Sequence, residues 1–285
     1  MVFDRYTPLS RTEEIARRTL TPLTFRIGQQ ALASRGEVFS EHQIDLARES
    51  FVVYVPAGAP AKDGYGLLVF IAPWSEATRP RMWRTPLDRH GLIFVSATSS
   101  GNEEKVLDRR LPLALLAWEN VRARYPIDPK RVYVGGLSGG SRAAEITALA
   151  YADVFRGFQE TRLVYVTGEA DDVNLHDDKV SRASMRDWCV FNVEVKYPRK
   201  LGHEPLDRAS FDQALDALEQ KSAVDPGELA RCNARVQREL AAKLAEAEAA
   251  IVRGDRDEAR AQLRAIDGQY GGLAAPAILD LNARM

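Results

Sequence analysis

Short, uninterrupted apolar runs bounded by glycine or proline are the feature that most constrains the fold. The clearest run, residues 67–72, lies between Gly66 and Pro73. Such a run is typical of a strand that is buried on both faces, as in a parallel sheet. Further runs of this kind, which we also predict to be strands, occupy residues 51–56, 92–95, 131–135, 163–167 and, more weakly, 193–197.

Segments with a helical apolar period separate these runs. Residues 111–125 place leucine, tryptophan and valine on one face, after a candidate helix cap at Asp108. We expect further helices after Gly140 and from about Asp207. Strands that alternate with helices along the chain favour an open, mostly parallel α/β sheet flanked by helices.

The two ends of the chain lie outside this alternation. Residues 1–48 are mixed and polar, and we expect them to form an N-terminal arm of short elements. Residues 226–285 are rich in Ala, Glu and Arg with apolar residues at helical spacing, and Gly254 interrupts them. The sequence therefore predicts an α/β domain over residues 49–222 and a C-terminal α-helical hairpin over residues 226–285.

Composition excludes several classes of protein. Lys and Arg total 39 against 40 for Asp and Glu, so no basic field indicates a nucleic-acid partner. Two cysteines exclude a disulfide scaffold, and no His/Cys cluster has the spacing of a metal site. The charged N-terminus does not fit a signal peptide, and no apolar run is long enough to span a membrane. We expect a cytoplasmic chain, or a secreted or periplasmic one whose leader has been removed.

The sharpest local motif surrounds Ser138. Residues 134–140, Val-Gly-Gly-Leu-Ser-Gly-Gly, contain the pattern G-x-S-x-G directly after a predicted strand and before a predicted helix, as in a nucleophile elbow. The glycines permit the sharp turn, and the N–H of Gly139 at the helix N-terminus favours a developing oxyanion. The alternative is a plain glycine-rich strand-to-helix turn, with or without a role in phosphate binding. The lysine or the G-x-G-x-x-G of phosphate-binding loops is missing.

A nucleophilic serine needs a base, and the chain has four histidines. We select His203 because it directly follows the last predicted strand, where the catalytic loops of α/β sheets gather. The other three lie in the arm, before a strand and in an acidic loop: His42, His90 and His176.

The acid is expected after a strand between the serine and the histidine. Residues 168–174 supply two adjacent candidates, Asp171 and Asp172. Neighbouring residues on one loop cannot both face the imidazole, so we predict Asp171 as the acid with Asp172 as the runner-up. A solvated acidic loop and a weak cation site are the alternatives for this segment.

The motif and its flanks resemble a known family. Residues 127–140, Ile-Asp-Pro-Lys-Arg-Val-Tyr-Val-Gly-Gly-Leu-Ser-Gly-Gly, are similar to the nucleophile block of the polyhydroxybutyrate depolymerase and feruloyl esterase-like α/β-hydrolases. Residues 151–157, Tyr-Ala-Asp-Val-Phe-Arg-Gly, resemble that family's Y-P-D-x-F-x-G, and the likeness covers about residues 50–220. The resemblance implies an α/β-hydrolase fold and ester hydrolysis without a metal or organic cofactor. It also implies Ser138 as nucleophile, Asp171 as acid and His203 as base.

Two departures from this family affect the expected site. Many hydrolases place a His-Gly pair after the third strand, but this chain has Pro73, which carries no N–H. We therefore expect the second oxyanion donor, beside Gly139, to be the N–H of Trp74 or Ser75. Only residues 158–162 separate the Y-P-D-like segment from the next predicted strand, so we expect a reduced or absent lid.

The sequence thus predicts a serine carboxylesterase that acts through an acyl-enzyme on a small or oligomeric ester of hydroxyalkanoate, acyl or feruloyl type. One alternative is a non-catalytic binding or scaffolding protein with the α/β-hydrolase fold that uses its C-terminal helices. A further alternative is a serine peptidase on the same fold. The C-terminal helices are also a candidate surface for a homodimer.

Overall fold

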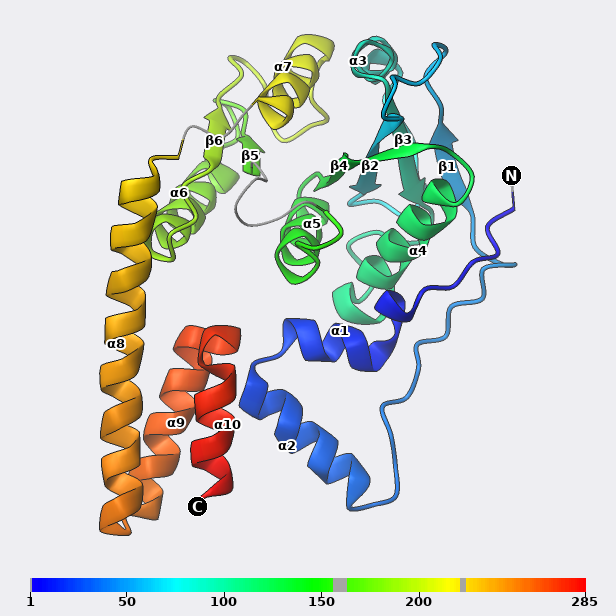
Figure 1. Cartoon of the computed structure of the whole chain (residues 1–285). Helices are drawn as coiled ribbons and strands as arrows, with labels where there is room; N and C mark the ends of the chain where they lie inside the picture. Colours follow the sequence, from blue (N-terminus) through cyan, green and yellow to red (C-terminus); the bar gives the residue numbers. More distant parts are fainter. Residues whose placement is uncertain (1, 156–162, 221–223) are drawn as a thin grey trace. The chain divides into compact units, whose positions relative to one another are not determined.

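A computed structural model describes residues 2–155, 163–220 and 224–285 (Figure 1). The chain divides into two compact units. The first contains Met1–Arg11 and His42–Val224, and the second contains Thr12–Glu41 and Asp225–Met285. The N-terminal arm, expected as one segment over residues 1–48, is therefore divided between the two units.

The first unit contains a four-stranded sheet with the strand order β1-β3-β2-β4 (Figure 1). Strand β1 runs antiparallel to β3, and β2 runs parallel to both β3 and β4. The central position of β2 explains its uninterrupted apolar run, because side chains on both of its faces are covered. The strands match the predicted runs and are β1 (Phe51–Tyr54), β2 (Tyr65–Ile71), β3 (Leu92–Ala97) and β4 (Ile127–Gly136).

A second, two-stranded parallel sheet consists of β5 (Leu163–Val166) and β6 (Val193–Lys196). Helix α6 (Asp172–Asp187) connects them, as parallel neighbours require a crossover connection. Among the described residues, no ladder joins this pair to the larger sheet. The segment 156–162, which includes the predicted short link and reduced lid, lies outside the described residues.

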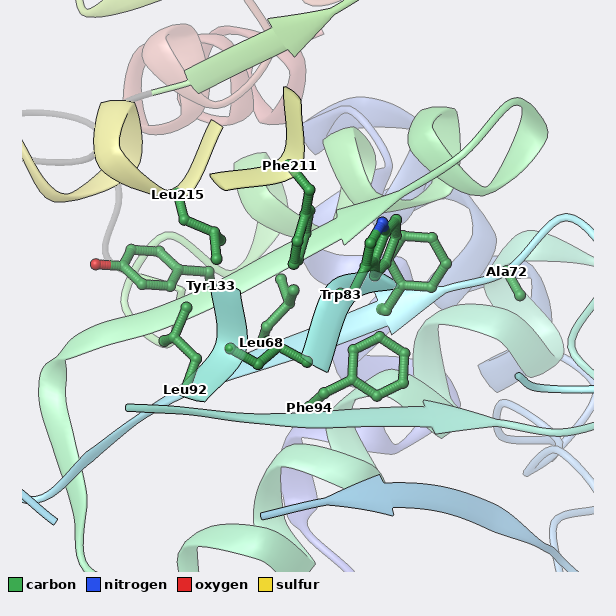
Figure 2. Packing of buried hydrophobic residues seen from close by; sticks show 10 residues of the cluster. Leu68, Ala72, Trp83, Leu92, Phe94, Tyr133, Phe211 and Leu215 are labelled. Carbon is green, nitrogen blue, oxygen red and sulfur yellow. The ribbon is translucent and has the colours of Figure 1, made fainter. Parts of the chain in front are cut away.

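One face of the larger sheet is covered by α3 (Arg84–His90) and α7 (Arg208–Glu219). Figure 2 shows Phe211 of α7 lying against Trp83, and the two rings stack with centroids 4.1 Å apart and an interplanar angle of 9°. The Trp83 indole also donates a hydrogen bond of 2.7 Å to the carbonyl of Leu206. Burial of such rings contributes about 1.5–3 kcal/mol each, so α7 and the loop before it are fastened to the sheet.

Helices α4 (Leu111–Arg122) and α5 (Gly139–Ala150) also pack on strands of the larger sheet. Helix α4 does not begin with a cap at Asp108, so that prediction is wrong. A π-helical turn, η3 (Val106–Arg110), precedes α4 and turns the side chain of Arg110 into the interior, where it is 3% exposed. The short 3-10 turns of this unit are η1 (Pro8–Ser10) and η2 (Arg81–Trp83).

In the part that the structure describes, the regular elements of the second unit are all helices (Figure 1). Its longest helix ends at Gly254, whose φ of 79° lies in the left-handed region that glycine adopts without strain. The carboxylate of Asp255 then accepts a hydrogen bond of 3.2 Å from the N–H of Glu258 and begins the next helix. The helices are α1 (Thr12–Thr19), α2 (Pro22–Ala33), α8 (Pro226–Arg253), α9 (Arg256–Tyr270) and α10 (Ala275–Ala283), with the 3-10 turn η4 (Gly271–Ala274).

A buried carboxylate joins the N-terminal and C-terminal segments of this second unit. Asp267 of α9 accepts a hydrogen bond of 3.0 Å from the N–H of Leu23 and another from the hydroxyl of Thr21, at the start of α2. It thereby caps α2 from a distant part of the chain. Across the described ranges, none of the helices combines the length and apolar character needed to cross a membrane.

Candidate active site

Ser138 lies at a strained turn between β4 and α5. Its backbone has φ 55° and ψ −129°, a conformation that costs free energy for a residue with a side chain. A Cβ on Gly136 would lie 2.3 Å from the carbonyl carbon of Gly140, and one on Gly140 would lie 2.0 Å from the carbonyl oxygen of Ile71. Both flanking glycines are therefore required for the turn, which supports the interpretation of the motif as an elbow.

Asp171 and His203 lie together at the ends of β5 and β6. Asp171 is 8% exposed and caps α6, while the side chain of His203 is 45% exposed. The Nδ1 atom of His203 lies 2.8 Å from Oδ2 of Asp171. This contact favours a proton on Nδ1 and leaves Nε2 available as a base.

The two loops that carry this pair are joined through their backbones. The N–H of Ala170 donates to the carbonyl of Leu201 at 3.0 Å, and that of Glu169 donates to the carbonyl of Pro198 at 3.0 Å. Because both bonds lie within a few residues of the carboxylate or the imidazole, the loops fix the relative position of these groups. The Asp171–His203 pair, with α6 and the loop before α7, is called the acid–base half of the site below.

Asn174 completes the acid–base half and was not selected from the sequence. Its Nδ2 atom lies 2.9 Å and 3.0 Å from the two carboxylate oxygens of Asp171, and 2.9 Å from Nδ1 of His203. Burial raises the pKa of Asp171, but the hydrogen bonds from His203 and Asn174 outweigh it and hold this pKa below its ordinary value. The available signal was the spacing, because a residue three positions after a helix cap faces back toward the cap.

Asp172, the runner-up acid, occupies a different environment. It is the first residue of α6 and is exposed. Within the described ranges it makes no hydrogen bond to His203, which contacts Asp171 instead. Its charge lies at the positive end of the helix dipole, where a carboxylate is stabilising.

The expected oxyanion donors lie on two neighbouring segments. Gly139 is the first residue of α5, so no helical carbonyl precedes its N–H. Trp74 and Ser75 lie in the loop after β2, and the Ser75 hydroxyl donates to the carboxylate of Glu103. Backbone bonds from Asn102 to the carbonyl of Pro73 (2.9 Å) and from Ser99 to that of Ser75 (2.6 Å) hold this loop against the loop after β3.

Arg110 is a second residue that was not selected from the sequence. Its guanidinium donates to the carbonyls of Ala72 (3.0 Å), Ser100 (2.9 Å) and Gly139 (3.3 Å). These carbonyls belong to the loop after β2, the loop after β3 and the first turn of α5. No sequence pattern indicates this contact, since it joins three segments that are distant along the chain.

The Ser138 elbow and the acid–base half are joined by side chains. The connection is made by Arg142 of α5, whose guanidinium lies 3.2 Å from the carboxylate of Asp178 on α6. The hydroxyl of Thr167, directly after β5, donates to the same carboxylate. Among the described residues, no hydrogen bond connects Ser138 to His203. Catalytic hydrogen bonds are often long or poorly aligned in an unliganded enzyme and tighten in the reacting complex.

A cavity of about 240 Å³ lies beside the elbow, between β4, β5 and α7. Its walls are mostly apolar and include Leu137 of the nucleophile motif and Ser141 just after it, but not Ser138 itself. Since the candidate nucleophile does not line it, we assign this cavity no part in binding the reacting group.

The remaining histidines have other surroundings. His90 is buried at the end of α3, with Nδ1 2.8 Å from the carboxylate of Glu219 on α7, so it serves the packing of these two helices. His42 contacts the carbonyl of Ser10, and His176 is exposed on α6. In the parts of the chain that the structure describes, no three His, Cys, Asp or Glu side chains are grouped to hold a metal ion.

Neither a family model nor a curated protein matches the sequence. Several solved structures are similar in part. Est1E from Butyrivibrio proteoclasticus is 11% identical with a TM-score of 0.48, and the match covers 61% of this chain and 94% of that one. Esterase 2 from Thermogutta terrifontis is 16% identical with a TM-score of 0.44, covering 61% and 86%. A putative dipeptidyl aminopeptidase IV from Bacteroides ovatus is 12% identical with a TM-score of 0.46, covering 60% and 33%. These three TM-scores are all below 0.5, so we infer the chemistry from the residues of this chain.

Proposed function

We propose that this protein is a serine carboxylesterase whose α/β domain spans about residues 49–222, with the helices of residues 226–285 as an appended hairpin. The observation that carries the proposal is the presence, in one compact unit, of a strained serine elbow and of a buried carboxylate that orients an imidazole. A strained serine alone is compatible with a structural turn, and an Asp–His pair alone is compatible with an ordinary surface ion pair. Together, at the carboxyl ends of parallel strands, they supply a nucleophile and its base.

In the proposed reaction, Oγ of Ser138 attacks the ester carbonyl carbon while Nε2 of His203 accepts the hydroxyl proton. The tetrahedral oxyanion accepts hydrogen bonds from the N–H of Gly139 and from that of Trp74 or Ser75. His203 returns the proton to the departing alcohol, which leaves an ester between the acyl group and Ser138. Water, activated by the same imidazole, then releases the carboxylic acid and restores the serine.

Asp171 has a positioning and electrostatic role in this scheme. It holds the proton of His203 on Nδ1, so that Nε2 faces the serine as a base, and its negative charge stabilises the imidazolium that forms. The amide of Asn174 donates to both oxygens of this carboxylate and so helps to hold it in place. None of these steps requires a metal or an organic cofactor.

The proposal is tested with a fluorophosphonate probe, which reacts with an activated serine without any assumption about the ester. We expect one probe per chain, mapped to Ser138, with no labelling of Ser138→Ala and slow labelling of His203→Ala. Hydrolysis of p-nitrophenyl butyrate, lost in the same variants, would establish esterase activity, and a p-nitroanilide peptide would test for a peptidase. Folded wild-type protein that takes up no probe would refute the catalytic proposal and favour a binding role.

A further inference from the structure

The buried guanidinium of Arg110 contacts both segments that carry the expected oxyanion donors. Its three carbonyl acceptors include that of Ala72, two residues before Trp74, and that of Gly139, whose N–H is the first oxyanion donor. The two segments that carry the donors are thus bonded to one rigid, planar group. A guanidinium presents its N–H groups in a fixed fork, so it holds these segments at a defined separation.

The hydrogen bonds of Arg110 in the described part of the chain are not accompanied by an ion pair. Within the described ranges, no carboxylate lies at ion-pair distance from its guanidinium, and its hydrogen bonds go to neutral carbonyl oxygens. A charge that is 3% exposed and not neutralised by an ion pair is costly to bury. Burial accordingly lowers the pKa of Arg110, and the nearby charge of Glu103 raises it in part. An arginine nevertheless remains protonated at neutral pH.

The neighbouring Arg109 provides an internal comparison. It lies in the same π-helical turn and also holds the loop after β3, by donating to the carbonyl of Ser99 at 2.6 Å. Its guanidinium, however, is paired with the carboxylate of Glu49 at 3.0 Å and 2.8 Å. Two adjacent arginines thus hold the same loop. Among the described residues, Arg110 contacts the segments of the expected oxyanion donors without making an ion pair, whereas Arg109 is paired with Glu49.

We propose that Arg110 is the positioning residue of the oxyanion hole, where it sets the spacing of the two donor segments and places a buried positive charge behind them. This inference rests on the proposed esterase function. A cation that makes no ion pair in a poorly solvated position stabilises an anion that forms nearby, and it does not have to reorganise as the charge develops. The arrangement would offset the loss of a donor at Pro73, which has no N–H.

The test compares Arg110→Gln and Arg110→Lys with Arg109→Gln, using p-nitrophenyl butyrate. We expect Arg110→Gln to lower kcat about 30- to 100-fold with KM changed less than threefold, because the lost interaction is made with the transition state. Arg110→Lys keeps the charge but not the fork, so we expect a loss of about three- to tenfold. Arg109→Gln should keep kcat within about threefold of the wild type, even where its thermal stability falls.

The affinity for a trifluoromethyl ketone, which forms an anionic adduct with the nucleophilic serine, is a second measurement. It would not change if the role of Arg110 were only structural. The affinity of the Arg110 variants for this ketone should fall in proportion to their kcat/KM. Their affinity for the product butyrate should stay within twofold of the wild-type value. Equal losses of kcat in Arg110→Gln and Arg109→Gln, or a rise in KM without loss of kcat, would overturn the inference. If Arg110→Gln does not fold, Arg110→Lys against Arg109→Lys decides in the same way. An unreactive wild type would instead refute the esterase proposal itself.

Discussion

Replacement of Asp171 by asparagine separates the two acids that the sequence leaves as candidates. The change keeps the shape of the side chain and removes its charge 2.8 Å from Nδ1 of His203. Nδ2 of Asn174 is nearly equidistant from both carboxylate oxygens, at 2.9 Å and 3.0 Å. An introduced amide therefore directs its own NH₂ group either at the imidazole or at the NH₂ of Asn174, and neither orientation satisfies both neighbours.

The size of the effect follows from two contributions. A unit charge about 4–5 Å from an imidazolium, at an effective dielectric constant of about 20, is worth about 3–4 kcal/mol. The half-exposed ring of His203 favours the lower end of that range, which is a factor of about 150 in rate. Loss of the hydrogen bond that fixes the tautomer contributes about 1–1.5 kcal/mol more, or roughly a further tenfold. We therefore expect kcat for Asp171→Asn to fall about 10³-fold.

The matched control is Asp172→Asn, which removes the same charge one residue away. That side chain is exposed at the start of α6, so its loss should change kcat less than twofold and weaken the helix by about 0.3–1 kcal/mol. The assay is the steady-state hydrolysis of p-nitrophenyl butyrate, with the Ser138→Ala rate subtracted as background. A loss below tenfold for Asp171→Asn, or a larger loss for Asp172→Asn, would refute the assignment of the acid.

Three further outcomes are expected. Asn174→Leu removes the amide donor to Asp171 and should raise the pKa of that carboxyl and lower kcat/KM about tenfold, as measured in a pH–rate profile. Phe211→Ala removes a buried stacked ring and should lower the free energy of unfolding by about 3–5 kcal/mol in a urea titration; a loss below 1 kcal/mol would contradict the packing. Burial raises the pKa of Glu219, but bonds from His90 and an arginine outweigh it and hold this pKa below its ordinary value. This carboxylate therefore contributes stability above about pH 4.3 that is lost as the pH falls through the lower folded pKa. Glu219→Gln should flatten the fall in Tm below pH 5.

The parts of the fold that could be predicted from the sequence are those determined by neighbours along the chain. The apolar run of β2 between Gly66 and Pro73 has one physical explanation, a strand covered on both faces, and the structure confirms it. The turn at Ser138 was predictable for the same reason, because its two glycines and its hydroxyl all lie within five residues. The start of helix α7 near Asp207 is another prediction that the structure confirms, and there the carboxylate of Asp207 caps the helix.

The parts that could not be predicted depend on contacts between distant segments. The carboxylate of Asp267 caps a helix that begins at Pro22, and no local pattern in either segment indicates this partner. The same holds for Arg110, whose acceptors lie in three separate loops, and for the pair of Arg142 and Asp178. A charged residue in a mixed polar stretch is ordinarily exposed, so the sequence favours the wrong environment for a buried one.

This division between local and distant contacts also separates the two parts of the site. The elbow at Ser138 is fixed by backbone sterics, since Gly140 packs directly on the carbonyl of Ile71 and leaves no room for adjustment. The acid–base half is held to it mainly by side chains, through Arg142 with Asp178 and through the packing of α7. The serine is thus positioned by close backbone contacts, and the histidine by contacts that individually cost only a few kcal/mol to break. In the proposed reaction the imidazole must reach the hydroxyl, so we expect the side-chain contacts to determine how often the two groups meet and the expected oxyanion donors to determine the rate once they do.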